Sequence, residues 1–198
     1  MNAAIHQGFG PDTTERLPLP PLDSMNDAQR AAAQALIAGP RKGVKGPFIP
    51  LMRSPVLLER LASVGEYLRF ESTLPGNVNE FVMCIVAREL GNQFEWATHY
   101  PLAIKAGVSE ATLKALAQGA RPRSMTDEEA QAWAFTVELL HRHGVSDLTY
   151  DAALERWGEQ GVIEIGALIG YFACVCWIMN IARTPAPGGV TALAGFPA

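Results

Sequence analysis

Glu95 and His99 are the residues of this 198-residue sequence whose types and spacing most directly suggest chemistry. They are four positions apart, so on a helix they share one face, with Cβ atoms about 5 to 6 Å apart. A carboxylate and an imidazole placed in this way can share a proton and exchange it near neutral pH, particularly beside aromatic Phe94 and Trp96. We interpret the pair as a candidate acid/base centre. The alternative is a Glu/His pair that only stabilises its helix.

A metal site is not expected here. Ligands at positions i and i+4 of a helix suit zinc, but the remaining histidines form no second ligand motif. These histidines are His6, His141 and His143. No phosphate-binding loop or dinucleotide fingerprint is present either, so we expect no cofactor.

The cysteines form neither a disulfide framework nor a metal motif. Cys174 and Cys176 are two positions apart on an apolar helix and point to different sides, and Cys84 is distant from both in sequence. The N-terminus lacks a basic segment followed by an apolar one, as in a secretion signal. These features predict a reducing, cytoplasmic location.

The composition excludes some partners and leaves two explanations for an apolar surface. The net charge of −4 implies no polyanion-binding surface, so nucleic acid is not an expected partner. Apolar residues make up 48% of the chain and charged residues only 18%, below the roughly 25% usual in soluble domains. The uncharged run from Ile165 to Ala182 fits a membrane helix or a buried helix near a subunit interface. Glu164 and Asn180 bracket the run without a flanking basic cluster, which favours the buried helix and no membrane.

Prolines, glycines and capping residues divide the chain into helices. Residues 1–22 predict a flexible N-terminal arm, 23–183 a single helical domain and 184–198 a C-terminal tail. Capping is predicted at Asp23-Ser24 for the first helix and at Asn77, paired with Glu80, for the third. The predicted helices cover 24–37, 54–70, 77–91, 92–107, 109–118, 126–143, 146–157 and 161–182, with a loop over 41–52. No alternating strand pattern occurs, so the fold class is all-α, with about seven to eight helices.

The segment from Asn79 to His99 resembles the carboxymuconolactone decarboxylase family, which also contains the AhpD-like alkylhydroperoxidases. The shared pattern is a polar residue before Glu80, an apolar helix ending at Gly91, and then aromatic-Glu-Trp-x-x-His, here residues 94–99. The resemblance covers about 45–182 and is most specific in its first half. It implies an AhpD-like helical fold and assembly into a homo-oligomer, a trimer or a hexamer.

The resemblance also separates two kinds of chemistry. The peroxidase branch has a Cys-x-x-Cys motif before its histidine, at the positions of Asn92 and Glu95 in this chain, so thiol-dependent peroxide reduction is disfavoured. The acid/base parts are retained, at Glu80 and His99. The resemblance therefore implies the decarboxylase-type branch, with Glu80, Glu95 and His99 as catalytic residues and no cofactor.

The implied substrate is a small organic acid, a carboxylated lactone or unsaturated acid from aromatic ring cleavage. Losing carbon dioxide would leave a dienolate that must be stabilised and protonated. An arginine should hold the anionic substrate, and Arg88 is favoured over Arg53 and Arg69 because it follows Glu80 by two turns. A surface ion pair with Glu89 is the competing interpretation of Arg88.

Four residues are expected to line the substrate site, and three further functions stay open. The expected lining residues are Cys84, Arg88, Phe94 and Trp96. The open functions are an isomerase or hydrolase of a related ring-cleavage product, an AhpD-like peroxidase, and a non-catalytic helical assembly protein in which the glutamates and His99 only satisfy one another.

Overall fold

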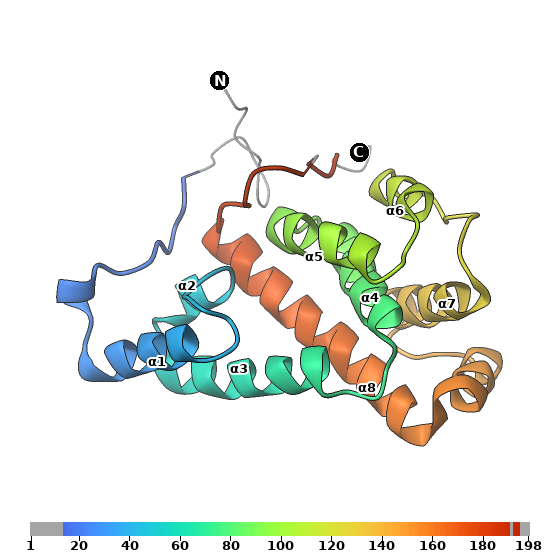
Figure 1. Cartoon of the computed structure of the whole chain (residues 1–198), viewed down its shortest axis with the longest axis horizontal. Coiled ribbons are helices and arrows are strands. Elements are labelled where there is room, and N and C mark those ends of the chain that lie inside the picture. The colour runs from blue at the N-terminus through green and yellow to red at the C-terminus, as the bar shows by residue number, and fades with distance from the viewer. Residues whose placement is uncertain (1–13, 191, 195–198) are drawn as a thin grey trace.

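The computed structural model describes residues 14–190 and 192–194. Over these residues the chain forms eight α-helices and one short 3-10 helix and contains no strand (Figure 1). The predicted all-α fold is confirmed. In chain order the elements are η1 (Leu22–Ser24), α1 (Asp27–Ala38), α2 (Phe48–Leu51), α3 (Pro55–Phe70), α4 (Gly76–Glu89), α5 (Gln93–Lys105), α6 (Glu110–Ala117), α7 (Asp127–Arg142) and α8 (Asp147–Ala182).

Helix α4 lies at the centre of the fold. It packs against α5, α7 and α8, and α6 contacts it from the side. Its residues from Phe81 to Arg88 are all buried, as expected for a helix covered on every side. Helices α1, α2 and α3 lie along the other side of α8, which crosses the molecule between the two groups (Figure 1).

Most predicted helix starts are correct because their capping residues act locally. Asn92, Ser109, Thr126 and Ser146 each accept a backbone hydrogen bond from the residue three positions on. Pro55 occupies the first turn of α3, as its position after Ser54 predicted.

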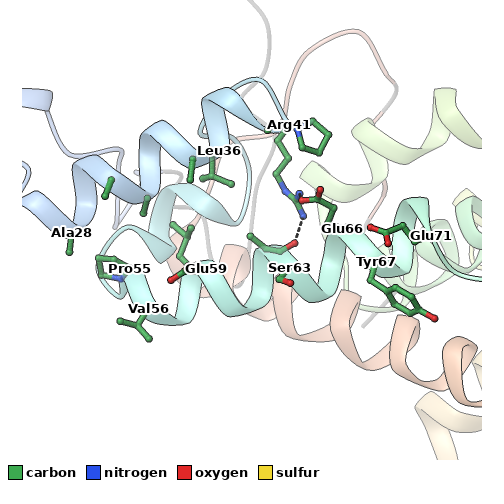
Figure 2. Close-up of a pocket in the computed structure, with 17 residues that line it drawn as sticks. Ala28, Leu36, Arg41, Pro55, Val56, Glu59, Ser63, Glu66, Tyr67 and Glu71 are labelled. Carbon is green, nitrogen blue, oxygen red and sulfur yellow. Dashed lines mark hydrogen bonds and ion pairs between the residues drawn. The ribbon is translucent and has the colours of Figure 1, made fainter.

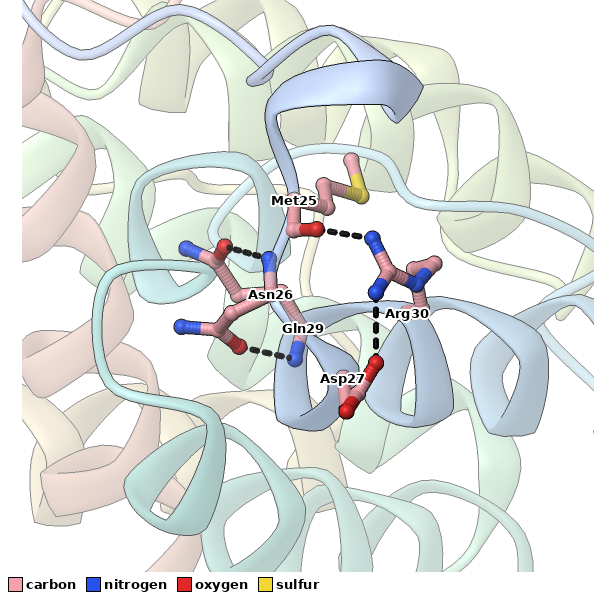
Figure 3. Close-up of polar contacts among 5 residues, drawn as sticks. All are labelled: Met25, Asn26, Asp27, Gln29 and Arg30. Carbon is pink, nitrogen blue, oxygen red and sulfur yellow. Dashed lines mark hydrogen bonds and ion pairs between the residues drawn. The ribbon is translucent and has the colours of Figure 1, made fainter.

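The predicted start of the first helix is wrong. Helix α1 begins after Asn26, and residues 22–24 form the separate element η1. The Asn26 side chain accepts from the Gln29 N–H at 2.9 Å, and the Gln29 side chain accepts from the Asn26 N–H at 3.0 Å (Figure 3). This reciprocal capping box satisfies two backbone donors and fixes the start at Asp27.

The predicted box between Asn77 and Glu80 is also absent, because both side chains have distant partners. Asn77 donates to Glu128 on α7 at 3.3 Å, and Glu80 contacts His99 on α5. Helix α4 instead starts directly after Pro75. The predicted loop over 41–52 is interrupted by α2, whose Phe48 and Leu51 are buried against neighbouring elements.

Helix α8 is broken at Gly158, where φ is 66° and ψ is 178°. The break separates the two segments that were predicted as individual helices. By length and composition α8 could cross a membrane, but 61% of its most apolar window is buried inside the molecule. A core helix satisfies the same criteria.

The ends of the described chain lie on the chain's own helices. In the arm, the Arg16 N–H donates to the Ala182 carbonyl at 2.8 Å. Arg53 donates to the carbonyl of Leu17 at 3.2 Å. In the tail, Leu193 is buried in a cluster with residues of α4 and α5. The remainder of the predicted arm and tail, including His6, lies outside the described residues.

Candidate active site

Helices α4 and α5 bring together the three residues predicted to be catalytic. Glu80 lies on α4, and Glu95 and His99 lie one turn apart on α5. The start of α5 is fixed by Asn92, whose side chain accepts from the Glu95 N–H at 2.8 Å and donates to Cys176 and Asn180 of α8. The position of Glu95 is thereby tied to α8 as well as to α4.

His99 is held between two carboxylates. Its Nδ1 lies 2.6 Å from Oε2 of Glu80, and its Nε2 lies 3.1 Å from Oε2 of Glu95. The side chains are 2% exposed for His99, 6% for Glu95 and 17% for Glu80. Both ring nitrogens therefore have acidic partners, and Glu80 is the most exposed of the three residues.

These contacts favour the protonated imidazole. Burial by itself lowers the pKa of His99, but the hydrogen bonds and charges of Glu80 and Glu95 outweigh burial, so the pKa is raised above its ordinary value. An imidazolium can donate through both ring nitrogens at once. The Glu80, Glu95 and His99 side chains, called the triad below, thus form one proton-sharing unit.

The Phe172 ring and the Cys84 thiol lie next to the triad. The Phe172 ring meets the His99 ring edge-on, with centroids 5.2 Å apart. Burial, together with the charges of Glu80 and Glu95, raises the pKa of the Cys84 thiol well above its usual value. Cys84 is therefore a neutral thiol beside the triad and no ready nucleophile.

The two aromatic residues expected at the site have different surroundings. The Phe94 ring packs against Gly46, where a Cβ would collide with it and where φ is 57°. Trp96 is buried in a cluster with Phe81 and stacks at a tilt on Tyr100, with centroids 5.3 Å apart. Trp96 is thus a core residue, and Phe94 packs α5 against the loop that precedes α2.

Arg88 binds the C-terminal segment of the chain. It is buried, and its Nη1 donates to the Ala194 carbonyl at 2.6 Å. Burial lowers the pKa of Arg88. Gln93 holds the same segment through two hydrogen bonds of 2.8 Å to the backbone of Leu193. The competing interpretation of Arg88 as part of a surface ion pair is wrong, because Arg88 is buried; the neighbouring Glu89 contacts His141 at 2.8 Å.

A groove of about 910 Å³ lies between α1 and α3, away from the triad (Figure 2). Small residues such as Ala28 line it, three glutamates are distributed along it, and Arg41 lies at one end. None of the triad residues lines this groove.

A second buried carboxylate, Glu164, stands out in the sequence only as the end of an apolar run. It accepts hydrogen bonds from the Tyr67 hydroxyl, from the Thr73 N–H and hydroxyl at 2.7 Å each, and from Gln160 at 2.9 Å. Burial opposes its ionisation, but these bonds hold the pKa of Glu164 at about 2. Only the Gln160 contact is local, on α8; Tyr67 lies on α3 and Thr73 in the loop after it, so no local pattern predicts the whole network.

Comparisons with known proteins agree with this architecture. The model of the carboxymuconolactone decarboxylase family matches residues 55–138, which include the whole triad. A crystal structure described as an alkylhydroperoxidase AhpD core, an uncharacterized peroxidase-related protein from Ralstonia eutropha JMP134, is similar with a TM-score of 0.70. The two sequences are 14% identical, and the match covers 87% of this chain and 92% of that one. No curated protein matches the chain. The predicted AhpD-like fold is confirmed, and residues 55–138 match the predicted family.

Proposed function

We propose that this chain, whose residues 55–138 match the model of the carboxymuconolactone decarboxylase family, is an acid/base enzyme that works without a cofactor. Its substrate is a small carboxylated lactone or unsaturated acid of the kind produced by aromatic ring cleavage, and its favoured reaction is decarboxylation. The observation that carries the proposal is His99 held at both ring nitrogens by carboxylates, at 2.6 and 3.1 Å.

The reaction needs a group that supplies a proton and stabilises negative charge. Loss of carbon dioxide leaves an electron pair that delocalises into the lactone carbonyl as a dienolate. The hydrogen bonds and charges of Glu80 and Glu95 raise the pKa of His99, which favours a proton and a positive charge at this position. That charge stabilises the oxyanion, and the proton is then transferred to carbon.

We assign different roles to Glu80 and Glu95, because their side chains differ in exposure. Glu95 is 6% exposed and contacts Nε2, so it orients the ring. Glu80 is 17% exposed and contacts Nδ1, so a substrate reaches the triad on the Glu80 side. We assign Glu80 as the carboxylate that passes the proton between His99 and the substrate.

Peroxidase chemistry is the weaker candidate, although the similar crystal structure is described as peroxidase-related. A thiol peroxidase needs a thiolate and a resolving thiol. At the positions of that pair the chain has Asn92, which caps α5, and Glu95, which contacts His99. The thiols of Cys84 and Cys176 have pKa values raised by burial, which disfavours thiolates there.

The same site is compatible with two further functions. An isomerase or hydrolase of a related unsaturated acid would need the same proton transfer beside a stabilised oxyanion. A non-catalytic assembly role is compatible with the near-complete burial of His99. For each of these functions we propose that the protein is a cytoplasmic homo-oligomer. The free thiols of all three cysteines are compatible with a reducing location.

Ultraviolet spectroscopy of the purified protein with 4-carboxymuconolactone and related ring-cleavage acids tests the proposal. We expect the wild type to convert at least one acid with release of carbon dioxide, and His99→Ala to be slower by about 100-fold or more. His141→Ala is the matched control, because His141 also pairs with a glutamate, at an exposed position. Identical traces for wild type and His99→Ala on every acid would contradict the proposal.

A further inference from the structure

A second polar centre lies one aromatic ring away from the triad, at the Tyr171 hydroxyl. Tyr171 and Phe172 are adjacent on α8, their ring centroids are 5.5 Å apart, and the Phe172 ring contacts the His99 ring. The Tyr171 hydroxyl lies against Gly65 of α3, where a Cβ would collide with it. Two successive ring contacts, from His99 to Phe172 and from Phe172 to Tyr171, therefore connect the triad to the residue that carries this hydroxyl.

Two arginines lie close to this hydroxyl. Arg41 donates from Nη2 to the Ala62 carbonyl of α3 at 3.1 Å, and its Nη1 is 3.9 Å from Glu66 (Figure 2). Its side chain is only 10% exposed. Arg69 lies one turn after Gly65, so it is on the face of α3 that contacts Tyr171.

Arg69 lacks a carboxylate partner within the described part of the chain. Its guanidinium lies 5.0 Å from the Phe70 ring centroid, and its Nε is buried without a hydrogen-bond acceptor. Asn79, directly before Glu80, donates to the Leu68 carbonyl and the Ser72 hydroxyl on either side of Arg69, at 3.2 Å each. A buried guanidinium N–H without an acceptor among the described residues is costly, so a further acceptor is expected here.

The charges around Tyr171 link this centre to the triad. Burial raises the pKa of the Tyr171 hydroxyl, Arg41 and Arg69 oppose that rise, and the Glu95 carboxylate adds to it. The hydroxyl is therefore a neutral donor whose charged neighbours include Arg41, Arg69 and Glu95. Glu66 is the other carboxylate near Arg41.

We propose that Arg69, Arg41 and the Tyr171 hydroxyl bind a carboxylate of the substrate beside the triad, an inference that rests on the proposed function. Guanidinium groups suit a carboxylate because they donate two parallel hydrogen bonds. Arg88, predicted for this role from its spacing, is instead bonded to the Ala194 carbonyl.

The bound carboxylate is the one that the substrate retains. A carboxylate that leaves as carbon dioxide gives up its charge, and two cations fixed on it would stabilise the ground state more than the transition state. In the proposed reaction, one carboxylate of the substrate is thus fixed at Arg69 and the other is lost near His99.

Calorimetric binding of furan-2,5-dicarboxylate, an unreactive ring dicarboxylate, tests this site. We expect Arg69→Gln to weaken binding by about tenfold or more, and Arg69→Lys to weaken it less. Arg60→Gln, on the exposed side of the same helix, should leave affinity within about twofold. Equal affinity of wild type and Arg69→Gln, or equal binding of the neutral diamide, would overturn the inference.

The probe also separates this inference from the proposed function. If acids are converted and Arg69→Gln leaves KM unchanged, the carboxylate site is wrong while the enzyme proposal stands. If binding of the dicarboxylate requires Arg69 but no acid is converted, the proposed function fails and the carboxylate site stands. Arg41→Gln provides a second variant should Arg69→Gln not fold, and it too is expected to weaken binding by about tenfold.

Discussion

At the scale of single residues, the His99 imidazole has two roles that follow from the same contacts. Its carboxylate partners hold the proton that the proposed reaction needs, and they also stabilise the fold. Breaking a buried pair leaves an uncompensated charge, which costs about 3 to 5 kcal/mol. The catalytic and structural roles therefore have to be separated by their pH dependence.

The free energy of unfolding, measured as a function of pH, separates the structural role of His99 from its proposed catalytic role. The folded-state pKa of His99 is raised, so its stabilisation is complete below the unfolded value of about 6.5 and is lost as pH rises through the folded value. We expect His99→Gln to destabilise the protein by about 3 kcal/mol near pH 6 and by less near pH 9. His141→Gln, measured by the same urea titrations, should change stability by less than about 1 kcal/mol at either pH. A cost of His99→Gln that grows with pH would contradict the raised pKa.

The sequence predicted part of the site, and the rest depends on distant contacts. Spacing on one helix predicted the Glu95–His99 contact, because i and i+4 positions always meet. Glu80 was implied by the family resemblance, since no spacing rule joins two helices. Tyr171 and Arg41 were missed, because only the folding of α3 against α8 brings them together.

At the scale of elements, the packing of α3 against α8 positions the proposed carboxylate site. Glu164 of α8 accepts hydrogen bonds from Tyr67 of α3 and from Thr73 in the loop after it. Gly65 allows the close approach of the two helices, since its missing Cβ leaves room for the Tyr171 hydroxyl. Both contacts can be tested without touching the triad.

Replacing Glu164 by Gln should destabilise the protein by about 2 to 3 kcal/mol at neutral pH, because four hydrogen bonds lose their charged acceptor. The depressed pKa of about 2 means that this stabilisation is present above the unfolded value of about 4.3 and is lost as pH falls toward 2. Chemical denaturation at pH 7 and pH 3 measures the difference. An equal cost at both values would show that the charge of Glu164 does not matter.

Gly65→Ala should destabilise the protein by about 1 to 3 kcal/mol, because the new methyl group overlaps the Tyr171 hydroxyl. The control is Gly76→Ala in the first turn of α4, where a Cβ meets no atom within 4 Å. Thermal unfolding of both variants gives the comparison. Equal melting temperatures for Gly65→Ala and the wild type would mean that α3 does not approach α8 as closely as described.

Local capping explains why most helix starts were predictable from sequence and two were not. A cap at Asn92 or Thr126 needs only the residue three positions on. Asn77 and Glu80 have the same local pattern, but their partners on α7 and α5 compete for the same side chains. Tertiary contacts therefore decided where α4 begins.

At the scale of the whole molecule, one face of α8 is apolar and exposed. Ile163, Trp177 and Ile181 are largely exposed, and the small residues between them are Ala167, Gly170 and the half-buried Cys174. Their spacing alternates between four and three residues, as in helices that pack together. We propose that this face meets the same face of another copy, because an uncharged stripe brings no like-charge repulsion between identical chains.

Sedimentation velocity tests this assembly. We expect the wild type to sediment as a homo-oligomer without detergent and Trp177→Lys to shift toward the monomer, because a lysine would place a charge in the apolar contact. Leu148→Lys, also at an exposed apolar position but before the Gly158 break, should leave the assembly unchanged. A wild-type monomer would contradict the proposal.

The central claim is that the triad delivers the proton to carbon after carbon dioxide is lost. The most direct measurement is decarboxylation in deuterium oxide, with the configuration of the deuterated carbon read by nuclear magnetic resonance. Delivery from the triad predicts one deuterium per product molecule in a single configuration. Equal amounts of the two configurations would mean that the intermediate is protonated free in solution, which would contradict the account.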